Sequence, residues 1–326
     1  MQKKRRIEYT PAGPTLQRFH MDNNRFRFIM GPVSSGKTTA MVWEIFKRCQ
    51  EQERDETGLR RSKWLVIRAS YRELDSTTIP SWRSIFGDEF GRFKWSAPPT
   101  HFLKFGDIRA EIIFFAADDP DGVDKLRGMN VTAAWLNEVN EIPRAILTMT
   151  TSRIGRYPTP DTCTWSGIMG DTNPPDPNHW YADLSKKQIK GWSFYEQPPA
   201  VLWANGQWVV NPAREGVMSE NWYRDQLDAS TEEEIKVFLA GQYGFMLKGR
   251  AVYGNEYNDS FHCVEIEPDP RHPIAIGSDW GLDPAAIIGQ KINGQIRWID
   301  EVVCHDMGAK RFVVHLKEYL NENYAG

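Results

Sequence analysis

Residues 31–38 read GPVSSGKT, and this stretch constrains the chain more than any other. It matches the pattern G-x-x-x-x-G-K-[ST], which specifies a phosphate-binding loop when a strand precedes it and a helix follows it. Residues 25–30 alternate and end apolar, as a short strand does, and residues 39–48 carry apolar side chains at helical spacing. Both flanks agree with the pattern, so a chance glycine turn before a core helix is the weaker interpretation.

The residue types of this loop predict how it binds a nucleotide. Backbone N–H groups and the N-terminus of the following helix direct positive charge at phosphate, and Gly36 allows the backbone to come close. Lys37 is expected to reach the β- and γ-phosphates, and the Thr38 hydroxyl to ligate Mg²⁺. We therefore expect ATP and Mg²⁺ as cofactors. The expected phosphate-binding residues are Gly31, Ser34, Ser35, Gly36, Lys37, Thr38 and Thr39.

The composition indicates a soluble globular chain. Its 326 residues allow about two domains, and 40% of them are hydrophobic and 25% charged. No apolar run reaches the ~18 residues of a membrane span, so we expect no membrane partner. The four cysteines show no C-x-x-C spacing, which indicates reduced thiols and no zinc site.

The charge distribution leaves one candidate for local nucleic-acid contact. The formal net charge of −3 is not the footprint of a nucleic-acid binder. Residues 3–6 are basic, and no apolar segment follows them, which excludes a secretory signal. This short tail either contacts nucleic acid or is simply solvated.

A second chemical element is the apolar strand expected at residues 131–138, which ends in Asn137 and Glu138. We expect it to run beside the strand that precedes the P-loop, with its last residues holding Mg²⁺ and orienting water. Asn137 can accept through its amide oxygen but brings no charge, which should weaken Mg²⁺ binding when no nucleotide is bound. Glu138 is the candidate base. The alternative is a strand end with two solvated polar residues.

Two further polar sites accompany these elements. A third strand is expected at residues 165–175 and ends in small and polar residues. Among them, Thr172 and Asn173 are the candidates for a γ-phosphate sensor that couples hydrolysis to movement. The alternative is a Pro-Pro turn with an Asx cap. Gln17 lies close to an aromatic residue, and its amide can both donate to and accept from an adenine edge. A surface glutamine is the alternative reading of that position.

The composition shifts after residue 268, where three strands and a helix are expected. The strands are residues 273–281, 285–290 and 295–303, and the helix is residues 311–320. The residues at 293 and 294 are Asn and Gly, a strong hairpin signal. The first strand delivers Asp279, a candidate ligand for a nuclease metal. This order is how an RNase H-like nuclease begins, and we expect the second domain to be incomplete in this chain. Such nucleases need several carboxylates for two metals, and Asp283, Asp300 and Glu301 are weaker candidates.

Taken in order, these segments resemble the large terminase subunit of tailed bacteriophages. The segments are residues 9–11 and 17–20, the loop at 31–38, residues 126–128, the Asn137-Glu138 pair, residues 170–174 and residues 277–281. The resemblance implies an ATP-driven motor that translocates viral double-stranded DNA into a procapsid through a portal protein. It also implies a C-terminal nuclease that cuts concatemeric DNA, a small terminase subunit and further copies of this chain as partners, and the host cytoplasm as the location.

The resemblance assigns roles to individual residues. Gln17 is expected at adenine, Lys37 and Thr38 at phosphates and Mg²⁺, and Glu138 as catalytic base. Arg127 lies just upstream of the acidic strand, where some members place an arginine that reaches a neighbouring subunit's nucleotide. Local helix capping is the alternative for Arg127. Asn137 departs from the usual Asp, which places metal binding at this site in question.

These observations predict an α/β protein of two parts. Residues 1–215 are expected to form an ASCE-type P-loop ATPase core with a mainly parallel sheet, and residues 216–265 a helical lid and linker. Residues 266–326 are expected to begin an RNase H-like nuclease domain. Two other functions fit the P-loop: a small-molecule kinase, and an ATP-binding scaffold that hydrolyses nothing. The polar end of the strand at 131–138 favours water activation over the kinase.

Overall fold

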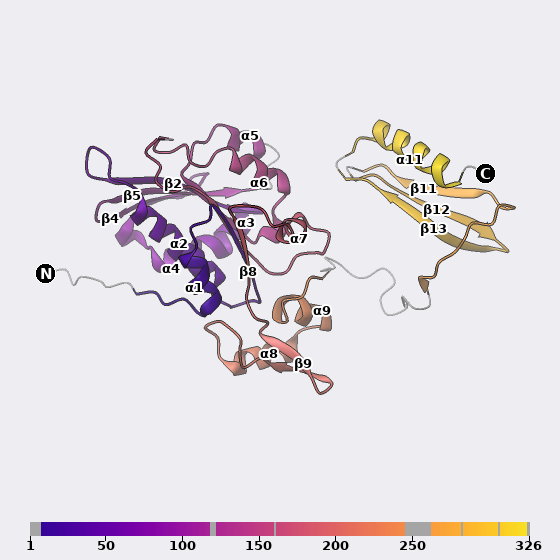
Figure 1. Cartoon of the computed structure of the whole chain (residues 1–326), viewed down its shortest axis with the longest axis horizontal. Helices are drawn as coiled ribbons and strands as arrows, with labels where there is room; N and C mark the ends of the chain where they lie inside the picture. Colours follow the sequence, from indigo (N-terminus) through magenta and orange to yellow (C-terminus); the bar gives the residue numbers. More distant parts are fainter. Residues whose placement is uncertain are drawn as a thin grey trace. The chain divides into compact units, whose positions relative to one another are not determined.

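The computed structural model describes residues 8–117, 122–159, 161–244, 262–281, 283–305 and 307–324. Two compact units make up the chain, Met1–Met246 and Leu247–Gly326, and each is described by itself (Figure 1). The division falls within residues 216–265, where the sequence predicts a lid and a linker. The basic tail at 3–6, the acidic residues 118–121 and the greater part of the glycine-rich stretch at 241–254 lie outside the described residues.

The first unit is built on an eight-stranded sheet of order β3-β4-β5-β2-β6-β7-β1-β8. The strands from β5 to β8 in that order run parallel, and β3, β4 and β5 pair antiparallel. This confirms the predicted α/β fold with a mainly parallel sheet. The strands are β1 (Phe26–Met30), β2 (Arg60–Arg68), β3 (Gly91–Lys94), β4 (Thr100–Phe105), β5 (Ile108–Ala116), β6 (Ala133–Asn137), β7 (Ile168–Thr172) and β8 (Trp192–Glu196).

Helices cover both faces of this sheet, and the alternation of its strands explains why (Figure 1). In β2, Trp64 and Val66 enter the core shared with α2 and α4, whereas Leu65 and Ile67 enter the core shared with α6 and α7. A parallel strand covered by helices on both faces has apolar side chains on both sides, so its buried part is a continuous apolar run. The helices are α1 (Pro14–Met21), α2 (Lys37–Glu51), α3 (Tyr71–Glu73), η1 (Leu74–Thr78), α4 (Ile79–Ile85), η2 (Asp88–Phe90), α5 (Gly122–Arg127), η3 (Val139–Glu141), α6 (Arg144–Thr151) and α7 (Trp180–Ser185).

One expectation about this sheet needs correction. The strand that ends in Asn137 does not run beside the P-loop strand, because β7 lies between β6 and β1. The antiparallel strands β3, β4 and β5 belong to the same sheet, because β5 also pairs parallel with β2 over its full length. β3 and β4 therefore extend the main sheet at one edge.

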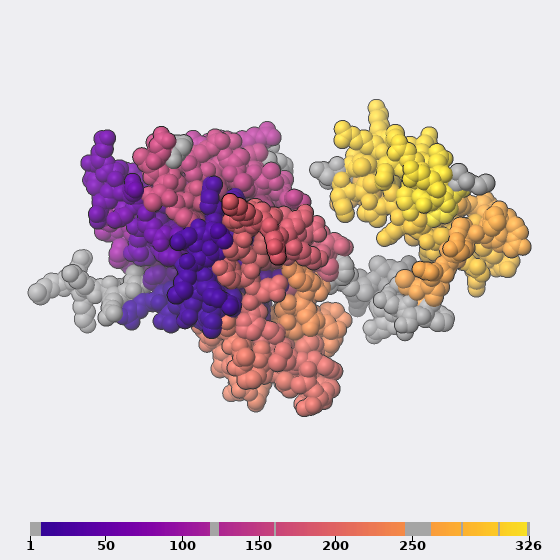
Figure 2. Space-filling model, viewed as in Figure 1, coloured from indigo at the N-terminus to yellow at the C-terminus, as the bar shows by residue number. Residues whose placement is uncertain are grey.

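A small separate core forms the lid, defined here as residues 200–240. It gathers Ala200, Val201, Tyr223, Ile235 and Leu239, against which Val33 of the P-loop also packs. The hairpin of β9 and β10 is thus part of the lid, although the sequence predicts a start at residue 216. In the space-filling view the lid projects at the lower edge of the first unit (Figure 2). Its elements are β9 (Val201–Ala204), β10 (Gln207–Val210), α8 (Glu220–Ala229), α9 (Glu232–Glu234) and η4 (Ile235–Leu239).

The second unit is a three-stranded antiparallel sheet of order β11-β12-β13 with one helix packed on it. Asn293 and Gly294 both have positive φ, 51° and 82°, which confirms the predicted hairpin turn. Phe312 and Leu316 of the helix pack on Ile288 and Val302 of the sheet. The elements are β11 (Ile274–Asp279), β12 (Ala285–Ile292), β13 (Gln295–Val303) and α11 (Ala309–Tyr324).

Two global features follow from the described residues. Within them, no helix combines the length and the apolar character that a bilayer crossing requires. All four cysteines are described and all are free thiols, with Cys49 and Cys304 buried and Cys263 exposed.

Candidate nucleotide-binding and catalytic site

The loop predicted to bind phosphate lies between β1 and α2, and its two glycines meet separate steric demands. Gly36 has a φ of +88° and directly precedes Lys37, the first residue of α2. That left-handed conformation strains any residue with a Cβ. Gly31 is needed for space, because a Cβ there would lie 2.4 Å from Oε1 of Gln197. The spacing of the motif is therefore explained by backbone geometry at one end and by packing at the other.

Gln197, immediately after β8, holds the loop in place. Its Oε1 accepts from Ser35 Oγ at 2.7 Å, and its Nε2 donates to the Ser35 carbonyl at 3.0 Å. The Gly31 N–H donates to the Thr172 carbonyl at 3.2 Å. Ser35 and Gln197 are both buried. The loop is thus ordered by the sheet before a ligand binds, which reduces the entropy cost of binding.

Lys37 is buried among neutral acceptors. Its Nζ donates to the carbonyls of Pro32 at 2.7 Å and Gly31 at 2.8 Å, and to Asn173 Oδ1 at 3.1 Å. Burial lowers the pKa of Lys37 to about 8, while the negative charge of Asp171 acts in the opposite direction. A buried ammonium whose direct hydrogen-bond acceptors are neutral is a strong attractor for phosphate.

A cavity of about 270 Å³ opens on the loop and brings together residues from three parts of the first unit. The P-loop contributes one wall, the ends of β6 and β7 another, and the lid the third. Gln17 is not part of this lining. The lining residues are Val33, Ser34, Ser35, Gly36, Lys37, Thr38, Thr39, Glu138, Asn173, Val217 and Met218.

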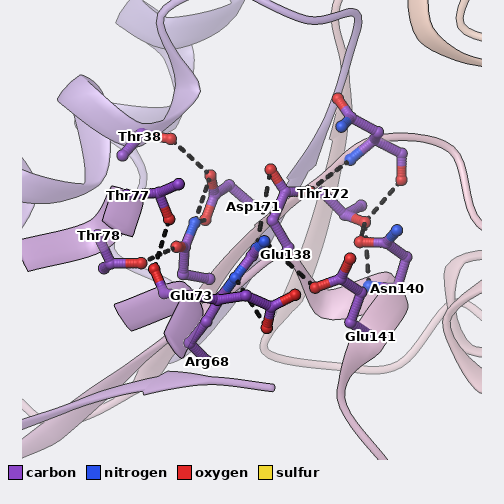
Figure 3. A network of polar contacts seen from close by, with 12 residues as sticks. Thr38, Arg68, Glu73, Thr77, Thr78, Glu138, Asn140, Glu141, Asp171 and Thr172 are labelled. Atoms are coloured by element: carbon purple, nitrogen blue, oxygen red, sulfur yellow. Dashed lines mark hydrogen bonds and ion pairs between the residues drawn. The ribbon is translucent and has the colours of Figure 1, made fainter. Parts of the chain in front are cut away.

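Glu138 stands at this cavity between two partners (Figure 3). Its Oε2 accepts from the Asn173 N–H at 3.4 Å, and its Oε1 lies 4.0 Å from Nη1 of Arg68. Arg68, at the end of β2, also pairs with Glu141 at 3.2 Å and Glu73 at 3.8 Å. Glu138 is 23% exposed, so water can reach its carboxylate. It also has a φ of +55°, a strained conformation of the kind found at functional sites.

Thr172 and Asn173 occupy different positions, although the sequence pairs them. Thr172 Oγ1 is buried and donates to Asn140 Oδ1 at 3.1 Å, in the turn that follows Glu138. Asn173 instead lines the cavity and joins Lys37 to Glu138 through its side chain and its backbone N–H. Of the two, only Asn173 lines the cavity.

The sequence predicts that the amide oxygen of Asn137 binds the metal, but in the structure this oxygen has another partner. That oxygen accepts from Thr78 Oγ1 at 2.7 Å, and Nδ2 faces Asp171 at 3.1 Å from Oδ1 and 3.3 Å from Oδ2. Asp171 in turn accepts from Thr38 Oγ1 at 3.3 Å and from Trp135 Nε1 at 2.7 Å. The carboxylate next to the Thr38 hydroxyl therefore comes from β7.

The side chains around Thr38 fit Mg²⁺, the ion that the predicted ATP chemistry implies. Thr38 and Asp171 offer a hydroxyl and a carboxylate, and Mg²⁺ prefers oxygen ligands. Within the described residues no three His, Cys, Asp or Glu side chains form a metal cluster. Mg²⁺ is commonly held by one or two protein oxygens together with substrate phosphates and water, so a full protein cage is not required.

Besides Gly31, Asn137 and Thr172, three predicted site residues are absent from the lining of this cavity. Gln17 is exposed on α1 and is absent from the cavity's lining. Arg127 is 64% exposed and pairs with Asp124 at 2.8 Å on α5. Asp279 is exposed at the end of β11, and Asp300 accepts from the hydroxyls of Tyr319 and Tyr324.

Three further residues of the site, Arg68, Gln197 and Asp171, were not predicted from the sequence. Arg68 and Gln197 each follow or end a strand at the same edge of the sheet, where side chains of parallel strands meet. Asp171 lies inside the segment 170–174 but is not singled out there. Polar residues at the ends of predicted parallel strands are the signal that marks all three.

Comparisons with known proteins agree with this fold. Residues 28–242 match the family model described as terminase large subunit, T4likevirus-type, N-terminal. No curated protein matches. Among solved structures, the large terminase of a thermophilic bacteriophage matches with a TM-score of 0.55 and 13% identity, over 96% of this chain and 74% of that one. Its ADP complex matches with a TM-score of 0.53 and 13% identity, over 95% and 70%. These structural likenesses show a shared fold, and the family model covers well over half of the sequence. The chain therefore belongs to the large terminase subunit family.

Proposed function

We propose that this large terminase subunit, an ATPase of a viral DNA-packaging motor, hydrolyses ATP in the cavity on its P-loop. One observation carries the proposal: Lys37, Asn173 and Glu138 meet at that cavity through hydrogen bonds of 3.1 and 3.4 Å. A cation for phosphate, an amide beside it and a water-accessible carboxylate are the groups that hydrolysis requires.

Each group has a defined task in this mechanism. The Lys37 ammonium and the loop N–H groups stabilise the negative charge that develops on the phosphates. Glu138 orients the attacking water and takes up its proton. Mg²⁺, when bound with the nucleotide beside Thr38 and Asp171, adds further charge stabilisation. Asn173 contacts both Lys37 and Glu138, so loss of the γ-phosphate changes its surroundings on both sides.

The lid is the element that responds to the nucleotide. The Val33 N–H donates to the Phe238 carbonyl at 2.9 Å, and Tyr223 donates to the Val33 carbonyl at 3.4 Å. Val33 also packs into the core of the lid. A shift of the loop on hydrolysis is therefore transmitted directly to residues 200–240, and we propose that this motion moves DNA.

The partners and the second unit belong to the same proposal. Double-stranded DNA is held chiefly by its phosphates. The portal protein, the small terminase subunit and further copies of this chain complete the motor, with exposed Arg127 acting on a neighbouring subunit's nucleotide. The second unit is RNase H-like and belongs to a nuclease, and the antiparallel sheet that carries Asp279 is the feature that supports this.

The test compares hydrolysis and binding in matched variants, with and without linear double-stranded DNA. Glu138→Gln should lose turnover and keep nucleotide binding, whereas Lys37→Ala should lose turnover. The control is Glu141→Gln, which removes another carboxylate paired with Arg68 but one that does not line the cavity. Turnover that survives Glu138→Gln, or that falls equally in Glu141→Gln, would contradict the proposed base.

A further inference from the structure

β6 ends in Asn137 and so lacks the carboxylate expected at that position, whereas the neighbouring strand β7 carries one, Asp171. β6 and β7 pair in parallel, and the register sets Asn137 directly beside Asp171. We propose that Asp171 supplies, from β7, the negative charge that Asn137 lacks, and so positions Mg²⁺ at Thr38. This inference rests on the proposed ATPase function and adds a residue to its metal site.

The position of Asp171 favours this role. β7 lies between β6 and the P-loop strand β1, so its end is one strand closer to α2 than the end of β6. Asp171 is completely buried, and its Oδ2 is 3.3 Å from the hydroxyl of Thr38. A carboxylate that touches the metal-ligating hydroxyl of a P-loop also lies within reach of the water shell of Mg²⁺.

The hydrogen bonds to Asp171 fix the orientation of its carboxylate. Trp135 Nε1 donates to Oδ1 at 2.7 Å, and Asn137 Nδ2 donates to both oxygens. Hydrogen bonds to an ionised acceptor are stronger than neutral ones, and here they come from groups that carry no charge. The negative charge is therefore held in place but not neutralised by these donors, and it remains available to a cation.

Asn137 is oriented to support Asp171 and not to replace it. Its Oδ1 is already used by the Thr78 hydroxyl at 2.7 Å, which leaves only the amide hydrogens on the side of Asp171. A carboxylate at position 137 would face Asp171 at the same short distance, and two like charges there would repel each other. An amide at 137 and a carboxylate at 171 are thus a matched pair.

A purely structural role is the competing explanation, since Asp171 also anchors Trp135 and Asn137. The two explanations differ in what an exchange of the two side chains does. If Asp171 serves only local packing, the double variant Asn137→Asp/Asp171→Asn is not expected to recover metal binding. If the charge matters, the exchange keeps one carboxylate and one amide at the same place.

The experiment measures the affinity of ATP-γ-S by calorimetry, with excess Mg²⁺ and with EDTA, in the intact chain. We expect Asp171→Asn to reduce the gain in affinity caused by Mg²⁺ by about 10- to 100-fold, the usual range for residues that support a metal. Its affinity in EDTA should be unchanged or higher, because a negative charge near phosphate is lost. The exchanged double variant should recover most of the Mg²⁺-dependent gain.

Each outcome decides between the explanations. An unchanged Mg²⁺ gain in Asp171→Asn would overturn the inference while leaving the ATPase proposal intact. A wild-type chain that binds no nucleotide with Mg²⁺ would overturn the ATPase proposal itself. If Asp171→Asn does not fold, judged by circular dichroism, the double variant decides: folded protein without a Mg²⁺ gain would overturn the inference.

Discussion

A buried ionic cluster joins α1 and β1 to the P-loop helix, and we predict that its loss destabilises the first unit. Glu44 of α2 forms an ion pair with Arg27 at 2.7 Å and accepts hydrogen bonds from Arg48 at 2.7 Å and from His20 Nδ1 at 2.6 Å. Glu44 and Arg27 are completely buried, and Arg48 is 2% exposed. The perturbation is Glu44→Gln, which keeps the shape of the side chain and removes its charge.

The expected size of the effect follows from the pKa of Glu44. Burial by itself would raise that pKa, but the hydrogen bond from His20 and the charges of Arg27 and Arg48 outweigh it, and the pKa falls from 4.5 to about 2. A shift of this size corresponds to about 3 kcal/mol of stability at neutral pH. Removal of one partner from a buried ion pair costs about 3–5 kcal/mol, which agrees.

The assay is urea unfolding of the intact chain at pH 7, followed by tryptophan fluorescence. Glu51→Gln is the matched control: Glu51 also pairs with Arg48 at 2.7 Å but is 38% exposed, so its loss should cost less than about 1 kcal/mol. Equal losses in the two variants, or a loss below about 1 kcal/mol in Glu44→Gln, would refute the reasoning.

The pH dependence gives the sign of the effect. The pKa of Glu44 is lower in the folded chain than in the unfolded one, so its stabilisation is complete above pH 4.5 and is lost as the pH falls towards 2. The difference between wild type and Glu44→Gln should therefore be the same at pH 7 and pH 5.5. It should shrink only below about pH 4.5.

Two further predictions concern the site. Burial lowers the pKa of Lys37 to about 8, so ATP affinity should fall about tenfold between pH 7 and pH 9 as the ammonium loses its proton. Lys37→Arg should show a flat profile in fluorescence titrations because a guanidinium stays charged, and a flat wild-type profile would contradict the assignment. Arg68→Gln should lower kcat by about 10- to 100-fold at saturating ATP, because Glu138 loses a positioning partner, with nucleotide affinity unchanged. Arg83→Gln, whose partner is the exposed Asp88, is the control and should leave kcat unchanged.

Much of the fold was predictable because neighbouring residues decide it. The alternation of residues 25–30 and the continuous apolar run of β2 indicate buried strands, and Asn293-Gly294 indicates a hairpin, all from local pattern. The order of the strands in the sheet was harder to predict from the sequence. Which strand lies beside β1 depends on crossover connections, and these place β7 and not β6 in that position.

The residues of the candidate site also differ in how far a local sequence pattern predicts them. Lys37, Thr38, Glu138 and Asn173 were predictable since a motif or a strand end marks each of them, and all four line one cavity. Gln17 was predicted from its amide chemistry and the resemblance, and Arg127 from the resemblance alone. The first unit does not bring either residue to that cavity.

By itself, the sequence determined that a phosphate-binding loop joins a buried strand to a helix, because glycine spacing and hydrophobic period are local properties. Only the tertiary structure decided which carboxylate meets Thr38. Asp171 and Asn137 are adjacent through the parallel register of β6 and β7, and hydrogen bonds to Thr78 and Trp135 set the direction in which each side chain points. Such contacts depend on the relative placement of distant segments, and no local pattern encodes them.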